Sequence, residues 1–207
     1  MIIEHLRREH HNVERLLAVL ERELKVFDRA GHTDYEVLRG IIGYFALYPE
    51  VYHHPQEDLV FAKLKTRDPS AAEKVGDLAQ EHRALTERLQ RAARAVATVL
   101  ADSEVLRQNV VKALGDFIEH QRRHMMMEER DFFPAALKAL QPEDWTEIAL
   151  ALISHNDPLF SDAAEQTFDT LRARILFLAK EAETDRYCEA FARIVAEGHS
   201  DAWRWRF

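Results

Sequence analysis

The sequence predicts an all-α protein, an antiparallel four-helix bundle with additional helices packed on it. Gly and Pro are both rare, with 6 of each in 207 residues, and long helices tolerate few of either. Apolar residues also recur at spacings of three and four along four long stretches that short turns separate. This spacing is typical of amphipathic helices. A chain of this length that is 47% hydrophobic can bury one sizeable core.

The first two helices are predicted over residues 2–30 and 34–65. Leucines and valines repeat along one face of the first stretch, which is rich in strong helix formers. Pro49 and Pro55 fall inside the second stretch. Because proline lacks a backbone N–H and clashes with the preceding turn, we expect a kink or a short break there.

The third and fourth helices are predicted over about 70–100 and 104–133. The fourth should end near Pro134, since proline disrupts a helix interior. Four long helices joined by short turns favour an antiparallel bundle. The remaining chain predicts shorter helices over about 143–153 and 160–181, and a tail that is helical from 185 until Gly198.

We therefore expect a bundle over residues 1–140 and a helical extension over 141–207 within the same domain. The net charge is −8 and no basic run stands out, so nucleic acid is not an expected partner. The first residues lack the apolar core of a signal peptide, and no run approaches the roughly 18 apolar residues of a membrane span. Cys188 is alone, which fits a reducing compartment such as the cytoplasm. A homodimer is left open.

The two halves of the predicted bundle repeat each other. EHHNVERLL from Glu9 matches EHRALTERL from Glu81, an offset of 72 residues. HHPQEDLVF from His53 matches HMMMEERDF from His124, an offset of 71 residues. A single His-x-x-x-Glu pair is a weak signal, but the same pair occurs twice at a matched distance from a matched histidine. The repeated positions are His10 with His82, His53 with His124, and Glu57 with Glu128.

This repeat suits a pair of metal ions. Residues i and i+4 share one face of a helix, so His53 with Glu57 and His124 with Glu128 can both point inward. The interior would then hold four imidazoles and two carboxylates, and buried carboxylates are costly and repel each other. Two divalent cations remove both problems. The nitrogen and oxygen ligand set suits iron, and would accept manganese, zinc or copper.

These segments resemble the hemerythrin-like (HHE cation-binding) proteins. The resemblance rests on EHHNVERLL, YPEVYHHPQEDLVF, EHRALTERL and HMMMEERDFFP, with a weaker match at DWTEIALALISHNDPLF, and spans roughly residues 2–176. It implies a four-helix bundle with a centre of two non-haem iron ions. Such a centre binds O2, and in some members reacts with peroxide or nitric oxide or serves as a sensor. The ligands that the resemblance implies are His10, His53, Glu57, His82, His124 and Glu128.

One position departs from the oxygen carriers of that family, whose third helix carries His-x-x-x-His. The second histidine is replaced by Thr86 here, so one terminal ligand is missing or comes from elsewhere. His120, one turn before His124, and Glu14, one turn after His10, are the candidates to replace it. His11 and His54 are adjacent duplicates that would be ligands if the register were shifted by one residue. The apolar neighbours expected to keep the site dry are Phe61, Phe132 and Phe133.

Two other functions compete with the oxygen-binding one. A ferritin-like diiron oxidase or peroxidase requires Glu-x-x-His on two helices, and Glu50 with His53 fits this pattern once. The equivalent position before His124 holds Gln121, so that pattern is incomplete. A metal-free bundle that serves as an interaction module is the third hypothesis.

Overall fold

The computed structural model describes residues 2–101, 106–152, 173, 175–178 and 180, and these residues form helices and turns without any strand. The all-α prediction is therefore confirmed. The α-helices (α) and π-helices (η) are α1 (Ile2–Asp28), α2 (Tyr35–Tyr48), η1 (Pro49–His53), α3 (His54–Arg67), α4 (Pro69–Val75), α5 (Leu78–Leu100), α6 (Arg107–Met127), η2 (Glu128–Phe132), α7 (Phe133–Ala139) and α8 (Pro142–Ala151).

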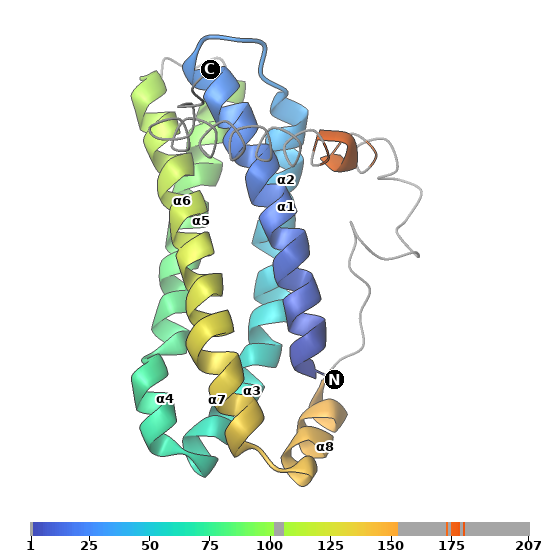
Figure 1. The fold of residues 1–207 in the computed structure, drawn as a ribbon. Helices are drawn as coiled ribbons and strands as arrows, with labels where there is room; N and C mark the ends of the chain where they lie inside the picture. Colours follow the sequence, from blue (N-terminus) through green and yellow to red (C-terminus); the bar gives the residue numbers. More distant parts are fainter. Residues whose placement is uncertain (1, 102–105, 153–172, 174, 179, 181–207) are drawn as a thin grey trace, which may run out of the picture.

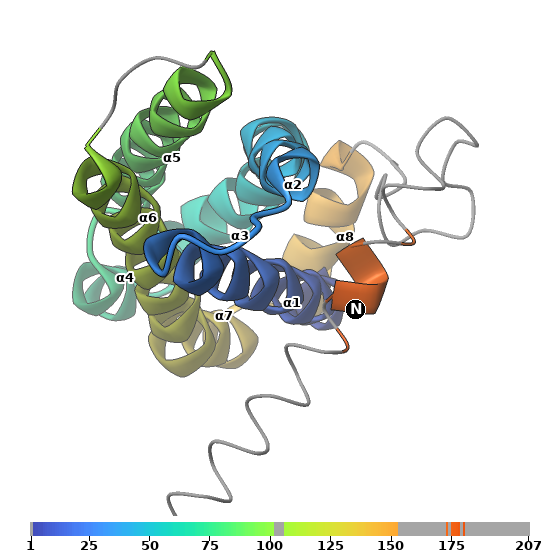
Figure 2. The ribbon, with the colours of Figure 1, turned by 90° about the horizontal axis from the view of Figure 1, so that it is seen from above.

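Four long rods run antiparallel and form the bundle (Figure 1). Two of them are α1 and α5. The other two are continuous through a π-helical turn: α2, η1 and α3 make one rod, and α6, η2 and α7 make the other. Seen from above, α1 lies beside α2 and α6, and α5 closes the ring by packing on the same two helices (Figure 2). Neighbouring rods are thus consecutive in the sequence or pair the first with the last.

The expected disturbance near Pro49 and Pro55 is a wide turn and not a break. The N–H of His54 donates to the carbonyl of Pro49, five residues earlier, and Pro55 follows directly. In an α-helix the ring of Pro55 would clash with the carbonyl four residues before it. A π turn adds a residue and relieves this crowding, so the rod continues from η1 into α3.

The same device carries the fourth rod past Pro134. The N–H of Phe133 donates to the carbonyl of Glu128, again five residues earlier, and Pro134 comes next. The prediction that this helix ends near Pro134 is wrong: α7 continues to Ala139. Because the wide turn lies just before the proline, the missing N–H costs the helix little.

The predicted third helix is divided into α4 and α5. Gly76 has a φ of 92°, a conformation that L side chains rarely adopt, and this reverses the chain after α4. Asp77 then caps α5, because its side chain accepts a hydrogen bond from the N–H of Gln80 at 3.0 Å. The long rod therefore begins at Leu78.

Two separate apolar cores lie along the bundle. The upper core, near the top of Figure 1, joins α1, α2, α5 and α6. The lower core joins the start of α1 to α3, α4, α7 and α8. Members of the upper core include Leu16, Leu20, Ile41, Phe45 and Phe117, and members of the lower core include Ile3, Leu6, Leu64, Phe132 and Phe133.

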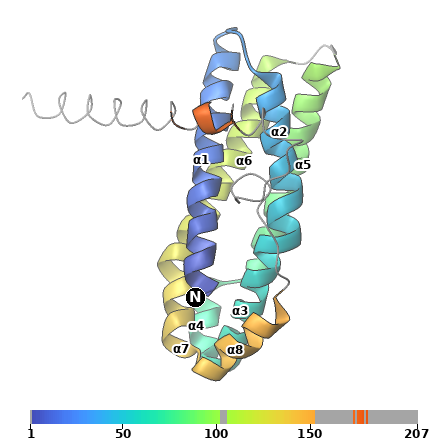
Figure 3. The same ribbon diagram turned by 90° about the vertical axis from the view of Figure 1, so that its right-hand side faces the viewer.

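The short helix α8 closes the lower end of the bundle, as Figure 3 shows. Asp144 accepts hydrogen bonds from Nε and Nη2 of Arg67 at 2.7 and 3.0 Å, and Ile148 is buried in the lower core. This agrees with the helix predicted over about 143–153. Within the described residues, no helix has the length and hydrophobicity required to cross a membrane.

Most of the predicted extension lies outside the described residues. The part outside the described residues includes most of the predicted helix over 160–181, the tail from 185 and Cys188. Of the extension beyond α8, residues 173, 175–178 and 180 are helical, and Ile175 is buried against the upper core. The division into 1–140 and 141–207 stays a prediction.

Candidate metal centre

The six predicted ligands converge between the two cores. All six side chains are buried, with at most 7% of any residue exposed. Each of the four rods contributes at least one of them. Their positions are His10 on α1, His53 in η1, Glu57 on α3, His82 on α5, His124 on α6 and Glu128 in η2.

Glu57 lies at the centre of this cluster. Its Oε1 atom is 3.2 Å from Nε2 of His53 and 3.5 Å from Nε2 of His10. Its Oε2 atom is 3.4 Å from Nε2 of His82. One carboxylate therefore faces imidazoles from three different rods.

Glu128 has the equivalent position in the second half of the repeat. Its Oε1 atom is 3.0 Å from Nε2 of His124 and 3.9 Å from Nε2 of His82. Its Oε2 atom is 3.4 Å from Nε2 of His10. Both carboxylates thus contact imidazoles of both halves, as bridging ligands between two cations would.

These close approaches do not have the geometry of hydrogen bonds. Neither oxygen of Glu57 or Glu128 has a hydrogen-bond partner among the described residues, nor does Nε2 of His82 or His124. Fully buried carboxylates without partners are costly. The donor set consists of nitrogen and oxygen atoms that face one another, so bound cations would satisfy all of these atoms.

The ligand atoms fall into two overlapping groups. Within each group, one ligand atom from every residue lies within 4.8 Å of the others. Each group could hold a metal ion, and the carboxylate of Glu57 is common to both groups. The first group is His10, His53 and Glu57, and the second is His54, Glu57, His82 and His124.

His54 is the residue that the sequence reasoning placed wrongly, as a duplicate that matters only if the register shifts. Both His53 and His54 are buried in the cluster. Neither ring nitrogen of His54 has a hydrogen-bond partner in the described structure, and its ring stacks on that of His82 with centroids 4.0 Å apart. The signal was available, because His54 and Glu57 are three residues apart and such pairs share a helix face.

Three carboxylates hold the outer nitrogens of the ligand histidines, and we call them the outer carboxylates. Glu9 Oε2 is 2.8 Å from Nδ1 of His53, Glu129 Oε1 is 3.0 Å from Nδ1 of His10, and Asp58 Oδ1 is 3.5 Å from Nδ1 of His82. Such partners fix the orientation of an imidazole and leave Nε2 free for a metal.

Glu9 was not predicted as part of the site. It is 3% exposed and also accepts a hydrogen bond from the hydroxyl of Tyr48 at 2.5 Å. A buried chain therefore runs from Tyr48 through Glu9 to His53. The repeat contained a signal for this role, since Glu9 recurs as Glu81.

Charge within the cluster is strongly coupled. Burial opposes the charged form of His53, but the charge and contact of Glu57 together with the contact of Glu9 outweigh it and raise the pKa of His53 to about 9. Burial likewise opposes protonation of His82, whose contacts with Asp58, Glu128 and Glu57 raise its pKa to about 11. The metal-free centre therefore holds protons where cations would lie.

The carboxylates show the opposite shift, and His54 differs from the other histidines. Burial favours the neutral form of Glu57, but the charge of His53 and the contacts of His10, His53 and His82 together outweigh it and hold the pKa of Glu57 well below its usual range. Burial and then the charge of His82 lower the pKa of His54 well below the ordinary value. His54 is thus neutral at pH 7, the form that binds a metal.

The structure assigns other roles to the two residues considered as replacements at the Thr86 position. Glu14 accepts two hydrogen bonds from Arg122 on α6, at 3.1 and 3.2 Å. His120 contacts Glu81, with Nε2 3.3 Å from Oε2. Neither belongs to the two ligand groups, whereas His54 does. Glu128 also lies outside both groups, although its carboxylate faces His10, His82 and His124.

The geometry does not support the incomplete ferritin-like pattern of Glu50 with His53. The hydroxyl of Thr86 donates to Oε1 of Glu50 at 2.5 Å. Glu50 is 33% exposed in its side chain and its nearest ligand-group contact is 3.9 Å, to Nδ1 of His54. The contacts of Glu50 are thus with Thr86 and the edge of the cluster, and they give the pair of Glu50 and His53 no support as metal ligands.

Aromatic side chains wall the centre on the side of the lower core. The ring of Phe133 stacks on that of His10, with centroids 5.3 Å apart. Phe61 and Phe132 meet edge to face, with ring centroids 5.5 Å apart, in the lower core. All three are buried, in agreement with the expectation that they exclude water.

The comparisons with known proteins agree with this geometry. The chain matches the hemerythrin HHE cation binding domain over residues 1–136, which include all four rods except the last residues of α7. No curated protein and no solved structure matches the chain. Because the match covers most of the chain and every residue of the metal cluster, this protein belongs to the hemerythrin HHE cation-binding family.

Proposed function

We propose that the chain holds a non-haem diiron centre that binds O2 or a related small oxidant, such as peroxide or nitric oxide. The observation that carries this proposal is the pair of ligand groups with Glu57 in common. A cluster for one ion would not need two groups, and a structural salt-bridge network would not leave both buried carboxylates without hydrogen bonds. Storage, sensing and detoxification are the roles such binding serves.

The two ions would have different numbers of histidine ligands. His10 and His53 would hold one ion, and His54, His82 and His124 the other, with both carboxylates between them. The ion with two imidazoles has fewer protein ligands, so it is the better place for a small molecule to bind. A ferrous pair, when bound, supplies two electrons to an oxidant.

The chain's own residues prepare the site for that chemistry. The outer carboxylates orient the imidazoles, so little reorganisation accompanies metal binding. Phe133 and its neighbours keep one side of the centre apolar. The described residues therefore supply orientation and dryness, which limit side reactions with water.

Elemental analysis of protein purified without added metal, followed by spectroscopy, tests the proposal. We expect about two iron ions per chain, and an absorption change when the ferrous protein meets air, peroxide or nitric oxide. His82→Ala and Glu128→Ala should each lower the metal content, whereas His11→Ala, at an exposed position, should not. An iron-loaded protein without any spectral response would refute the oxidant-binding function.

The two rival functions predict different results in the same experiments. A diiron oxidase or peroxidase would show steady turnover of an organic or peroxide substrate. A metal-free interaction module would contain no metal and take up none on reconstitution. We also propose a cytoplasmic location, on the basis of the single cysteine, and keep the homodimer as a prediction for sedimentation analysis.

A further inference from the structure

One ligand histidine lacks the outer partner that the others of the repeat have. The outer carboxylates hold Nδ1 of His10, His53 and His82. Nε2 of His124 faces Glu128 at 3.0 Å, but its Nδ1 is buried and has no hydrogen-bond partner among the described residues. An imidazole that binds a metal through Nε2 carries a proton on Nδ1, and that N–H normally donates to an acceptor.

The internal repeat shows which residue would be expected there. Glu9 holds His53 in the first half, and its counterpart in the second half is Glu81. Glu81 instead contacts His120 at 3.3 Å, and 45% of its side chain is exposed. Among the described residues, His124 therefore lacks the carboxylate contact that Glu9 makes with His53.

A cavity of about 310 Å³ lies beside His124 on the outer side of α5 and α6. His124 is the most buried part of its wall, and Val75 and Met127 make an apolar side. The polar lining consists of Glu81, Arg88, His120 and Arg123. The cavity thus extends from the surface to His124, the residue whose Nδ1 has no hydrogen-bond partner among the described residues.

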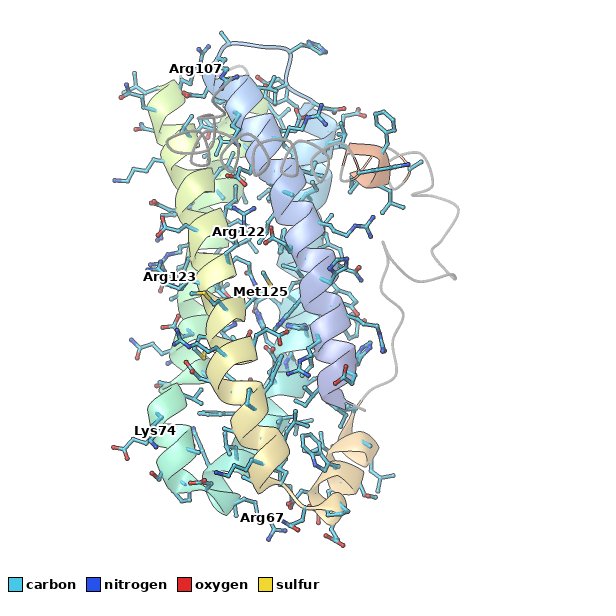
Figure 4. All side chains as sticks on the ribbon, in the orientation of Figure 1. Arg67, Lys74, Arg107, Arg122, Arg123 and Met125 are labelled. Carbon is cyan, nitrogen blue, oxygen red and sulfur yellow. The ribbon has the colours of Figure 1, made fainter. Side chains whose placement is uncertain are left out.

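Within the described residues, no carboxylate lies closer than 4.0 Å to either arginine of this cavity, and Nη2 of Arg123 is 3.3 Å from Nδ1 of His120. Arg88 donates to the carbonyl of Ala84 at 3.0 Å, and Arg123 is 4.0 Å from Glu119 on the surface. Arg122, the neighbour of Arg123, is different, since Glu14 and Glu21 pair with it at 3.1 and 2.9 Å. Figure 4 shows Arg122 on the α1 side of α6 and Arg123 on the other side. The cavity therefore offers two guanidinium groups to an added anion.

We propose that this cavity binds a small oxyanion, which accepts a hydrogen bond from Nδ1–H of His124 and is held by Arg88 and Arg123. The anion gives Nδ1–H of His124 a negatively charged acceptor, as the outer carboxylates do for Nδ1 of His10, His53 and His82. The inference rests on the proposed function in one respect, because it takes Nε2 of His124 as a metal ligand. Anion and metal then bind cooperatively, since each orients the ring for the other.

Titrations with sodium formate and sodium phosphate test the site, with sodium chloride keeping the ionic strength constant. Calorimetry on the metal-free protein measures anion binding, and absorption of the iron-loaded protein measures its coupling to the centre. We expect saturable binding of at least one probe and a saturable spectral shift, and the preferred probe distinguishes a carboxylate from a phosphate source. Chloride alone should produce neither.

Variants locate the binding. Arg88→Gln and Arg123→Gln should each raise the dissociation constant by about tenfold, as expected for loss of one charge-assisted hydrogen bond. Arg122→Gln is the matched control and should leave it unchanged. The proposal is overturned if the metal-free and iron-loaded proteins both bind neither probe, or if the affinity is the same in all three variants.

Glu81→Gln separates the anion site from the alternative that Glu81 turns inward to His124. On our proposal this variant keeps its metal and binds formate or phosphate at least as tightly as the parent, because a negative charge has left the cavity. Loss of both metal and anion response in Glu81→Gln would identify Glu81 as the partner and refute the site. A protein that binds the anion but no iron would refute the proposed function alone.

Discussion

Glu9 is the residue on which the first half of the centre depends. Its carboxylate accepts a hydrogen bond from the hydroxyl of Tyr48 and contacts Nδ1 of His53, and both contacts are buried. Glu9→Gln keeps the size but removes the charge that orients the imidazole. We expect metal affinity to fall by about 10–100-fold, the usual effect of losing such a partner.

Competition with a chelator measures that loss, and two variants serve as controls. Tyr48→Phe removes only the hydroxyl and should have a smaller effect. Glu4→Gln, on the exposed part of the same helix, should have none. Unchanged affinity in Glu9→Gln would show that His53 needs no outer carboxylate.

His54 gives a second prediction at this scale. If it replaces the ligand absent at Thr86, His54→Ala removes one of the three imidazoles of the second group. We expect the iron content to fall from about two toward one per chain, with the helical content unchanged. His11→Ala is the control, and a His54→Ala protein with the full metal content would exclude His54 as a ligand.

The repeat led to the prediction of six ligands, because periodic pairs of His and Glu can be read directly from the sequence, and the structure brings all six side chains into one buried cluster. His54 was missed because its counterpart in the repeat is Met125, a core residue, so the symmetry argument gave it no support. Glu9 was missed for a different reason. An acidic residue beside a ligand can face either way, and only the packed bundle shows that it meets Tyr48 and His53.

The π turns within two of the rods determine which way the helix faces that carry the predicted ligands point. η1 lies between the upper core and the Glu57 segment, and so it sets the rotation of α3 relative to α2. Deleting Val51, which is 49% exposed in η1, would remove the extra residue of the wide turn that accommodates Pro55. The residues after it would rotate by about 100°. We predict loss of metal binding with nearly unchanged helical content by circular dichroism.

Val51→Ala is the control for this deletion, because it shortens the same exposed side chain and keeps the number of residues. It should bind metal like the parent. If the deletion variant also binds two ions, the extra residue of the wide turn does not set the geometry of the centre.

The presence of the long helices could be predicted from the sequence, but the residues at which they end could be predicted less well. Proline signals were present at Pro55 and Pro134, but a sequence does not show whether a proline ends a helix or follows a π turn. The choice depends on tertiary packing. Phe132 and Phe133 are fully buried in the lower core, and their burial favours continuing the rod over ending it.

The whole molecule should respond to pH in opposite ways with and without metal. The pKa values of His53 and His82 are raised to about 9 and about 11 in the metal-free fold. Their contribution to stability is therefore full below the unfolded pKa of about 6.5, and is lost as the pH rises through the folded values. We expect the melting temperature of the metal-free protein to fall between pH 7 and pH 10.

Metal binding must displace the same protons. At pH 7 we expect loading to release protons from His53 and His82, and apparent affinity to rise with pH. Calorimetry in two buffers of different ionisation enthalpy measures the release. A metal affinity that is independent of pH between 6 and 9 would contradict the protonation states described above.

The position of the ligand layer between the upper and lower cores has a consequence for cooperativity. Buried members of the two cores form separate clusters, and the charged cluster lies between them. Without cations, few apolar contacts join the two cores, so the unfolding of one core should not unfold the other. Heating should then melt the two cores in two calorimetric steps. Bound ions would crosslink all four rods at mid-height, and the two steps should merge into a single transition.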